Sequence, residues 1–199
     1  MAEATPTMVF VYGTLKRGFP NHSLLVASAT PFVGAASTAG PASLIIGPYS
    51  VPFLLPTPAS ASSGRVVSGE LYAPSPAALA ELDALEASAS PPHQTRCSLS
   101  TGLGTHIGVY ERRPITVVVD GSGEVVQAEA YFAHPSYAEA LWRRCGGEEA
   151  EIGEYTVDHA GEYVPKSERL ADAAGLIDAI HRFVATATDN RRRAHGLLP

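Results

Sequence analysis

The chain has 199 residues, of which 45% are hydrophobic and 17% charged. This composition supplies one folded core and excludes a wholly disordered chain. Fourteen Lys and Arg against 20 Asp and Glu give a net charge of −6, which argues against a nucleic-acid partner because a phosphate backbone repels such a chain. No apolar run reaches the ~18 residues that a membrane-spanning helix needs.

The N-terminal part of the chain predicts mostly β structure. Short apolar runs bounded by glycine, proline and small polar residues are typical of strands, and a short helix is expected at 21–27, with Asn21 as its N-cap. The predicted strands cover residues 8–12, 42–47, 51–55 and 65–72.

A helix is predicted at 77–87, because Ser75 is a good N-cap and Pro76 suits the first helical position. Residues 88–108 carry turn signals and little periodicity, with one possible strand at 96–99. Strands at 110–120 and 124–133 flank a Gly-Ser-Gly turn, which predicts a hairpin.

Beyond residue 135 the pattern becomes helical. A short helix is expected at 137–145, ended by two glycines, and an amphipathic helix at 171–186 that packs on the main body through Leu176, Ile177, Ile180 and Phe183. The chain is therefore divided into a mostly β domain at 1–135 and a C-terminal helical extension at 136–199.

The first stretch that could carry chemistry follows the strand at 8–12. Gly13 stands directly after this apolar strand, where backbone amides can converge on an anion and a ligand can approach closely. The segment is neither a P-loop nor a Gly-x-Gly-x-x-Gly motif. A tight turn with an exposed basic loop is the other interpretation.

The second stretch is the helix at 77–87. On a helical wheel Glu86 falls between Leu79 and Leu82, inside the apolar stripe, whereas Asp83 flanks the stripe. A carboxylate on a buried face has a raised pKa, which suits general acid–base chemistry. Because Glu86 belongs to the last turn, an orientation toward water is an equally good interpretation.

Metal and nucleophile motifs give no competing signal. Cys97 and Cys145 are too few for a disulfide scaffold and have no Cys-x-x-Cys partner, so a reducing cytoplasmic location is expected. The N-terminus lacks the features of a secretory signal. The seven histidines form no metal motif and are expected to be surface or capping residues, and no metal is predicted.

Several motifs together resemble the gamma-glutamylcyclotransferase-like superfamily, above all its gamma-glutamylaminecyclotransferase, or AIG2-like, branch. The two most specific are Tyr-Gly-Thr-Leu at 12–15 and Leu-Asp-x-x-Glu at 82–86. The supporting segments are 47–52, 69–72, 110–114, 117–119 and 128–131. The resemblance covers residues 8–134.

The resemblance implies an α+β fold, a small mixed β-barrel flanked by helices. It also implies release of 5-oxoproline from γ-glutamyl amines such as γ-glutamyl-ε-lysine, with no cofactor. Glu86 would be the general acid–base, because the substrate's own α-amine is the nucleophile. The substrate-binding residues would be Tyr12, Gly13, Thr14, Leu15 and Tyr110. The implied partner is this small substrate, not a nucleic acid or a membrane.

One departure from the family concerns a Tyr-x-Arg element that usually follows the glutamate closely. Gln94-Thr95-Arg96 occupies that spacing here, whereas Tyr110-Glu111-Arg112 fits better but lies further on, as an insertion at about 88–108 would explain. Two other functions stay open. One is a cyclotransferase for γ-glutamyl peptides such as glutathione, and the other is a non-catalytic ligand-binding module on the same fold.

Overall fold

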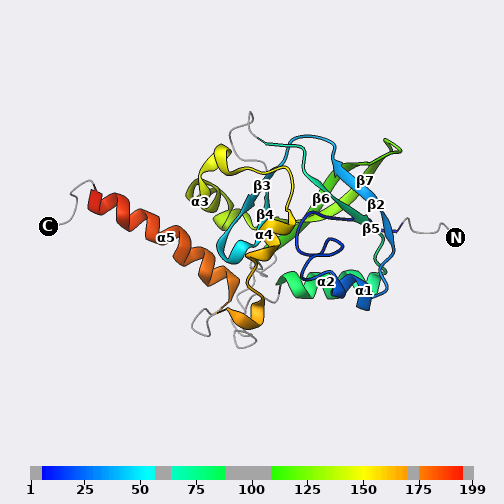
Figure 1. Ribbon diagram of the computed structural model, residues 1–199, viewed down its shortest axis with the longest axis horizontal. Helices are drawn as coiled ribbons and strands as arrows, with labels where there is room; N and C mark the ends of the chain where they lie inside the picture. The colour runs from blue at the N-terminus through cyan, green and yellow to red at the C-terminus, as the bar shows by residue number, and fades with distance from the viewer. Residues whose placement is uncertain (1–5, 57–63, 88–108, 170–174, 195–199) are drawn as a thin grey trace, which may run out of the picture.

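The computed structural model describes residues 6–56, 64–87, 109–169 and 175–194, and Figure 1 shows how its elements are arranged. The described strands are β1 (Val9–Val11), β2 (Phe32–Thr38), β3 (Ser43–Ile46), β4 (Pro52–Leu55), β5 (Ser68–Tyr72), β6 (Tyr110–Val119) and β7 (Val125–Ala133). The described α-helices are α1 (Ser23–Ala27), α2 (Pro76–Ala87), α3 (Pro135–Cys145), α4 (Val157–Gly161) and α5 (Leu176–Ala194). Short 3-10 turns are η1 (Pro48–Ser50), η2 (Gly147–Ala150) and η3 (Lys166–Glu168).

Five of these strands close into a barrel. They follow the order β1-β5-β2-β6-β7, and a parallel pairing of Val9 with Glu129 joins β1 to β7 and completes the ring. The antiparallel hairpin of β3 and β4 extends the sheet, because β4 runs parallel to β7 at Leu54 and Phe132. The predicted α+β class, a small mixed barrel flanked by helices, is confirmed.

Three apolar clusters hold this arrangement together. The barrel interior contains fully buried Phe10, Leu71 and Val117. A second cluster joins the β3–β4 hairpin to α3 and α5, and it contains Ile180. The third packs α1 and α2 against the ends of β1 and β7, with Leu82 at its centre. The core is thus continuous from the barrel to the helices on either side.

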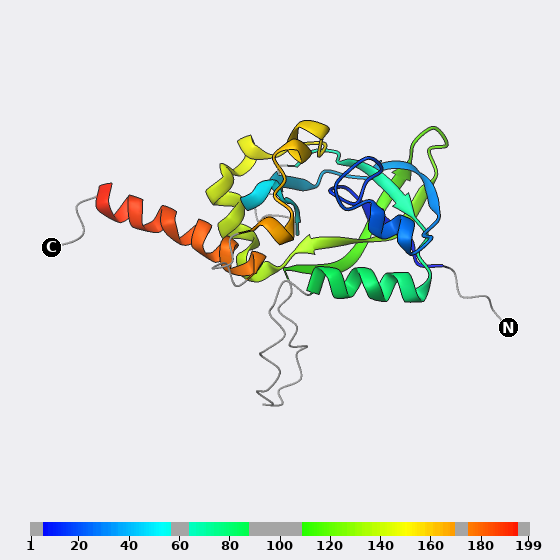
Figure 2. The ribbon, with the colours of Figure 1, turned by 60° about the horizontal axis from the view of Figure 1, so that its bottom comes forward.

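Helix α2 begins as predicted and runs along one side of the barrel (Figure 2). The Ser75 hydroxyl accepts a hydrogen bond from the Ala78 N–H at 3.2 Å, which satisfies one of the free amides of the first turn. Ala78 and Leu82 are buried against the barrel. The apolar stripe of this helix therefore faces the barrel, where α2 contacts β6.

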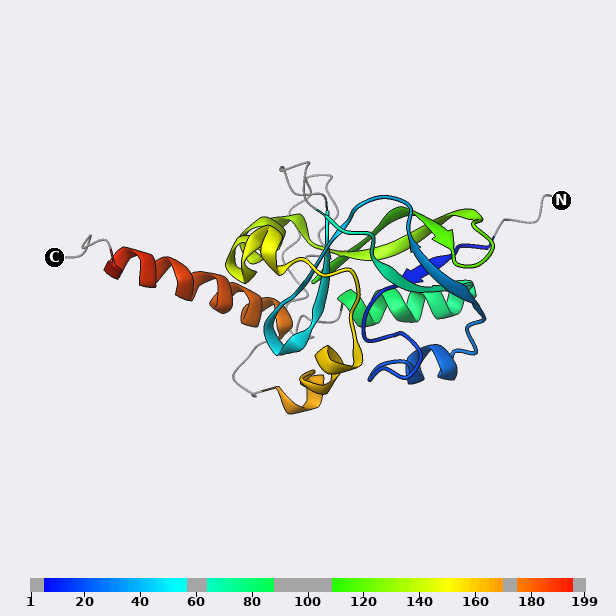
Figure 3. The ribbon, with the colours of Figure 1, turned by 45° about the horizontal axis from the view of Figure 1, so that its top comes forward.

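The chain after β7 returns to the barrel. Ile152 forms an isolated bridge with Leu44, and the Ser68 N–H donates to the Gly153 carbonyl at 2.8 Å. Helix α5 packs through Leu176 and Ile180, as predicted, and its far end points away from the body (Figure 3). None of the helices in the described ranges is long and apolar enough to cross a membrane.

Some predicted boundaries were wrong. Strand β2 was missed, because its Gly-Ala-Ala-Ser centre has little apolar alternation, and it forms because β5 and β6 pair with it on both sides. Helix α1 begins at Ser23 and has no side-chain cap, since Asn21 bonds elsewhere. Strand β5 begins at Ser68. The predicted strand at 96–99 lies outside the described residues.

Candidate active site

The loop that follows β1 presents three consecutive backbone amides. A tight turn closes between the Lys16 N–H and the Gly13 carbonyl at 3.1 Å, and the Asn21 N–H donates to the Thr14 carbonyl at 2.9 Å. Across the described ranges, no acceptor receives the N–H groups of Gly13, Thr14 or Leu15. Adjacent amides of this kind can bind an anion or a developing oxyanion.

The side chains of the same loop turn into the protein. Tyr12 and Leu15 are both buried, and the Tyr12 hydroxyl donates to the Tyr131 carbonyl at 2.5 Å. The same hydroxyl accepts from the Leu54 N–H at 3.4 Å. The Tyr12 side chain thus fixes the loop to β4 and β7.

Pro52 brings two of the predicted binding residues together. A Cβ on Gly13 would lie 2.5 Å from the Pro52 Cγ, so only glycine fits at this position. The Tyr110 hydroxyl donates to the Pro52 carbonyl at 3.0 Å, and its ring stacks on Phe53 at a centroid distance of 5.3 Å. Gly13 and Tyr110 therefore lie on either side of one proline.

Helix α2 is joined to the barrel by a polar cluster. The Asp83 carboxylate accepts from the Arg112 Nε at 2.8 Å and Nη2 at 3.1 Å, and from the Tyr131 hydroxyl at 2.8 Å. Arg112 also pairs with Glu129. Glu86 lies in the last turn of α2, one turn after Asp83, and its side chain lies outside the described part of the structure. Tyr131 thus contacts both the Tyr12 hydroxyl and α2.

The polar cluster includes Arg112 of the Tyr-x-Arg element at residues 110–112. Tyr110 and Arg112 both belong to β6, where one contacts Pro52 and the other contacts Asp83. Gln94, Thr95 and Arg96 lie outside the described residues. The role of Tyr110-Glu111-Arg112 in a substrate site stays a prediction.

A glutamate on β5 holds the far end of the loop. The Glu70 carboxylate accepts from the Arg17 N–H at 2.9 Å, the Arg17 Nε at 3.1 Å and the Tyr72 hydroxyl at 2.8 Å. Burial raises the pKa of Glu70, but these hydrogen bonds and the nearby cation outweigh burial and leave the pKa below its usual value. Glu70 is therefore ionised at neutral pH.

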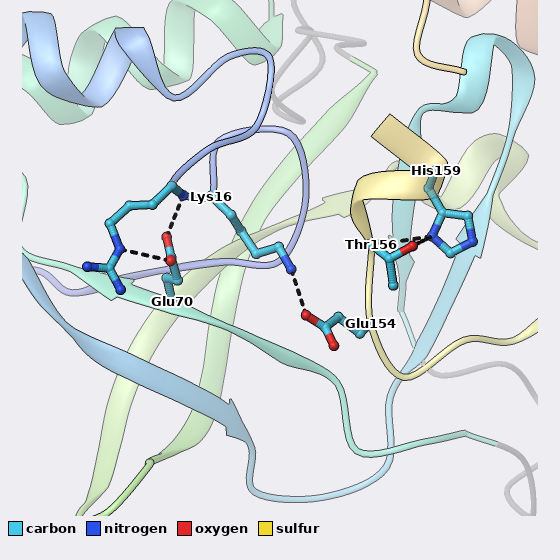
Figure 4. Close-up of polar contacts among 6 residues, drawn as sticks. Lys16, Glu70, Glu154, Thr156 and His159 are labelled. Atoms are coloured by element: carbon cyan, nitrogen blue, oxygen red, sulfur yellow. Dashed lines mark hydrogen bonds and ion pairs between the residues drawn. The ribbon is translucent and has the colours of Figure 1, made fainter. Parts of the chain in front are cut away.

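The segment after α3 closes the other side of the loop (Figure 4). The Lys16 Nζ lies 3.3 Å from the Glu154 Oε1, and the Asn21 amide bridges the Thr14 hydroxyl at 3.0 Å and the Tyr163 hydroxyl at 3.2 Å. Residues far apart in the sequence thereby surround one short loop.

The same segment supports a strained turn before β4. Tyr49 and Ser50 have φ values of 62° and 53°, which are unfavourable for residues other than glycine. The Val164 N–H donates to the Tyr49 carbonyl at 3.1 Å, and the Tyr155 hydroxyl donates to the Ser50 carbonyl at 2.9 Å. Burial raises the pKa of Tyr155 to about 12, so its hydroxyl remains a donor.

Two of the described histidines act as helix caps. The His134 side chain accepts from the Ser136 N–H at the start of α3, and His159 completes a capping box with Thr156 (Figure 4). Within the ranges that the structure describes, no group of three or more His, Cys, Asp or Glu residues could hold a metal ion.

Sequence reasoning missed three charged residues around this site. Glu70 and Arg112 lie within segments that carry the family resemblance but were given no role, and Glu154 lies outside every predicted element. The contacts of Glu70 with Arg17, of Arg112 with Asp83 and of Glu154 with Lys16 span 29 to 138 residues of sequence, so local spacing carries no signal for these three pairs. The Gly-Glu-Leu-Tyr motif was the one available hint, because Glu70 and Tyr72 share a face of a strand.

The comparisons with known proteins agree on one family. Residues 9–156 match the family model described as gamma-glutamyl cyclotransferase, AIG2-like, so the match runs past residue 135. A putative gamma-glutamylcyclotransferase from Arabidopsis thaliana is 38% identical over 95% of this chain and 97% of its own length. The human gamma-glutamylaminecyclotransferase is 45% identical over 40% of this chain and 52% of its own length.

The fold has a solved counterpart as well. The crystal structure of an AIG2-like protein from Mus musculus superposes with a TM-score of 0.62 at 26% identity. The superposition covers 83% of this chain and 100% of the mouse chain. The two chains thus share their overall fold over most of the length of this chain.

Proposed function

Because the chain belongs to the gamma-glutamyl cyclotransferase, AIG2-like family, we propose that it releases 5-oxoproline from γ-glutamyl amines such as γ-glutamyl-ε-lysine. The observation that carries this proposal is the row of amides at Gly13, Thr14 and Leu15, which have no acceptor within the described residues. A carbonyl oxygen that becomes negative during acyl transfer needs donors of this kind.

The reaction needs no cofactor, because the substrate supplies its own nucleophile. The α-amine attacks the γ-carbonyl carbon, the new C–N bond closes the five-membered ring, and the bond to the leaving amine breaks. As the neutral α-amine attacks, one proton must leave its nitrogen, and one must reach the departing nitrogen. We assign both transfers to Glu86, which acts in turn as base and acid.

We propose as binding residues those that the family resemblance implies. The amides of Gly13, Thr14 and Leu15 would hold the γ-glutamyl group, whereas the Tyr12 hydroxyl fixes the loop to β7. Tyr110 would line the site beside Pro52, where its hydroxyl is already oriented by the Pro52 carbonyl. We further propose a barrel domain at 1–135, an extension at 136–199 and a cytoplasmic location.

A second function is favoured by one comparison. The plant relative, which matches almost the whole chain, is called a gamma-glutamylcyclotransferase without reference to an amine, whereas the amine-specific relatives match a smaller share. Release of 5-oxoproline from γ-glutamyl peptides such as glutathione is therefore the alternative. A non-catalytic binding module on this fold is the third candidate.

A substrate panel separates these functions. The protein is incubated with γ-glutamyl-ε-lysine, with γ-glutamyl derivatives of simple amines and with glutathione, and released 5-oxoproline is quantified. The highest kcat/KM is expected for a γ-glutamyl amine. Highest activity on glutathione, with release of cysteinylglycine, would support the peptide function. Binding of 5-oxoproline without turnover of any substrate would indicate a binding module.

A further inference from the structure

Two adjacent cations, Lys16 and Arg17, follow the three amides of the candidate loop. A cation in this place is a natural ligand for the α-carboxylate of a γ-glutamyl substrate. In the structure both cations are engaged by carboxylates from distant parts of the chain, and Figure 4 shows Glu70 and Glu154 at opposite sides of the loop.

Glu70 makes the stronger of these contacts. Its side chain is 13% exposed, and its two oxygens accept three hydrogen bonds, two of them from Arg17 and one from Tyr72. The Arg17 guanidinium also lies over the Phe32 ring, 3.7 Å from its centroid. The guanidinium is thus held between a carboxylate and an aromatic ring on the barrel wall.

Glu70 contacts the candidate loop at both of its ends. Its backbone pairs with Val11, the last residue of β1, where the loop begins. Its side chain binds the backbone N–H of Arg17 at the other end of the loop. One residue therefore fixes both ends of the segment that contains Gly13, Thr14 and Leu15.

We propose that Glu70 is a positioning residue that orders the three amides before substrate arrives, and that the Arg17 guanidinium is a brace and not a substrate ligand. This inference rests on the proposed function of the loop. Donors that are already ordered act on a developing oxyanion without further reorganisation, whereas a loose loop must lose conformational freedom when substrate binds. Loss of Glu70 therefore weakens substrate binding.

The contact between Lys16 and Glu154 supports the same proposal. The Lys16 side chain is 6% exposed, and its ammonium lies 3.3 Å from Glu154 and 4.6 Å from the Phe19 ring centroid. Glu154 itself is 56% exposed, so this pair is weaker than the Glu70 contact. Both cations of the loop nevertheless hold the loop in place.

The kinetic test compares Glu70→Gln with Arg17→Ala. Glutamine has nearly the volume of glutamate, but its NH2 group would face the Arg17 and Tyr72 donors that Glu70 now accepts from. We expect KM to rise about 10- to 100-fold, the effect of losing hydrogen bonds to a charged group. Arg17→Ala keeps the backbone N–H that Glu70 binds, so its KM should rise by less than about tenfold, the effect of a partly exposed ion pair. Glu139→Gln, which breaks the exposed Glu139–Arg143 pair on α3, is the matched control and should leave both parameters unchanged.

A second measurement does not depend on turnover. Hydrogen exchange at the Lys16 and Asn21 amides, which donate within the loop, should be faster in Glu70→Gln and unchanged in Glu139→Gln. If Glu70→Gln does not fold, Tyr72→Phe keeps the ring and removes one hydrogen bond to Glu70, and should shift KM and exchange in the same direction by less.

Two results would overturn the proposal. The first is a folded Glu70→Gln protein with the KM and exchange rates of the wild type. The second is an Arg17→Ala protein that loses as much substrate binding as Glu70→Gln while its loop exchange stays normal, because the guanidinium would then be a ligand. If the wild type cyclises no γ-glutamyl compound, the proposed function fails, and hydrogen exchange alone decides whether Glu70 orders the loop.

Discussion

Two carboxylates one helical turn apart on α2, Asp83 and Glu86, are expected to respond to neutralisation in opposite ways. Asp83→Asn should lower the free energy of unfolding and leave most of the turnover, because Asp83 joins the helix to the barrel. Glu86→Gln should leave the stability nearly unchanged and lose the turnover, because it removes the assigned proton carrier. The two variants together distinguish a carboxylate that stabilises the fold from one that transfers protons, both on α2.

The size of the Asp83 effect follows from its contacts. Asparagine loses the charge that faces Arg112 and leaves Arg112 or the Tyr131 hydroxyl with one poorer acceptor. A hydrogen bond to a charged group contributes about 1.5–3 kcal/mol, but Asp83 is 41% exposed and Arg112 keeps its pair with Glu129. We therefore expect a loss of about 1–2 kcal/mol, which corresponds to a decrease in Tm of about 2–8 °C for a chain of this size.

The size of the Glu86 effect follows from the chemistry. Glutamine has nearly the volume of glutamate and still forms hydrogen bonds, but it cannot exchange a proton. General acid–base assistance contributes about 10²- to 10⁴-fold to a rate, and a sole carrier belongs at the upper end of that range. kcat should fall by this factor, whereas kcat of Asp83→Asn should fall by less than about tenfold once rates are expressed per folded molecule.

The assay combines thermal unfolding with 5-oxoproline release at matched concentrations of folded protein. The reasoning fails if Glu86→Gln turns over substrate at the wild-type rate, which would make Glu86 a structural residue. It also fails if Asp83→Asn has the wild-type Tm and no activity. That result would move the proton carrier to Asp83 and leave the ion pair with Arg112 without a structural role.

Three further predictions rest on single contacts. Gly13→Ala should lower Tm and raise KM, because its Cβ would meet the Pro52 ring at 2.5 Å, whereas Gly40→Ala, whose Cβ meets nothing within 4 Å, should do neither. The folded-state pKa of Glu70 is below its usual value of 4.5. The ionised Glu70 therefore stabilises the fold fully above pH 4.5, and this stabilisation is lost as the pH falls through the lowered pKa. Glu70→Gln should lack this pH-dependent loss of stability when its unfolding is followed in acid. Burial raises the pKa of Cys145 to about 11, which keeps the thiol protonated and unreactive. In a Cys97→Ser variant, iodoacetamide should therefore label Cys145 slowly until the protein is unfolded. Rapid labelling of the folded protein would contradict the burial of Cys145.

The sequence predicted those elements whose signals are local. The hairpin of β6 and β7 formed around Gly121-Ser122-Gly123, and the Ser75-Pro76 start of α2 was confirmed by the bond to Ser75. Strand β2 carries no comparable signal, because Gly and Ala at its centre are depleted in strands and provide no apolar alternation. Its existence depends on β5 and β6, which a local pattern does not describe.

The candidate site was predictable to a similar extent. The family resemblance gave the loop and Glu86, and the placement of Gly13 against Pro52 and of Tyr110 against the same residue agrees with it. The charged contacts that hold these parts were not predictable, because each joins segments that only the closed barrel brings together. Lys16 and Glu154, 138 residues apart, are the extreme case.

Closure of the barrel explains why the loop and α2 meet at a fixed spacing. The ring is completed by the parallel pairing of β1 with β7, so the loop after β1 emerges beside Tyr131 of β7. The Tyr131 carbonyl accepts from Tyr12, and its hydroxyl donates to Asp83. One residue on the closing strand therefore joins the predicted substrate loop to the helix that carries Glu86. The same pairing that completes the fold also connects the two halves of the candidate site, so the proposed chemistry would depend on a long-range strand contact and not on either motif alone.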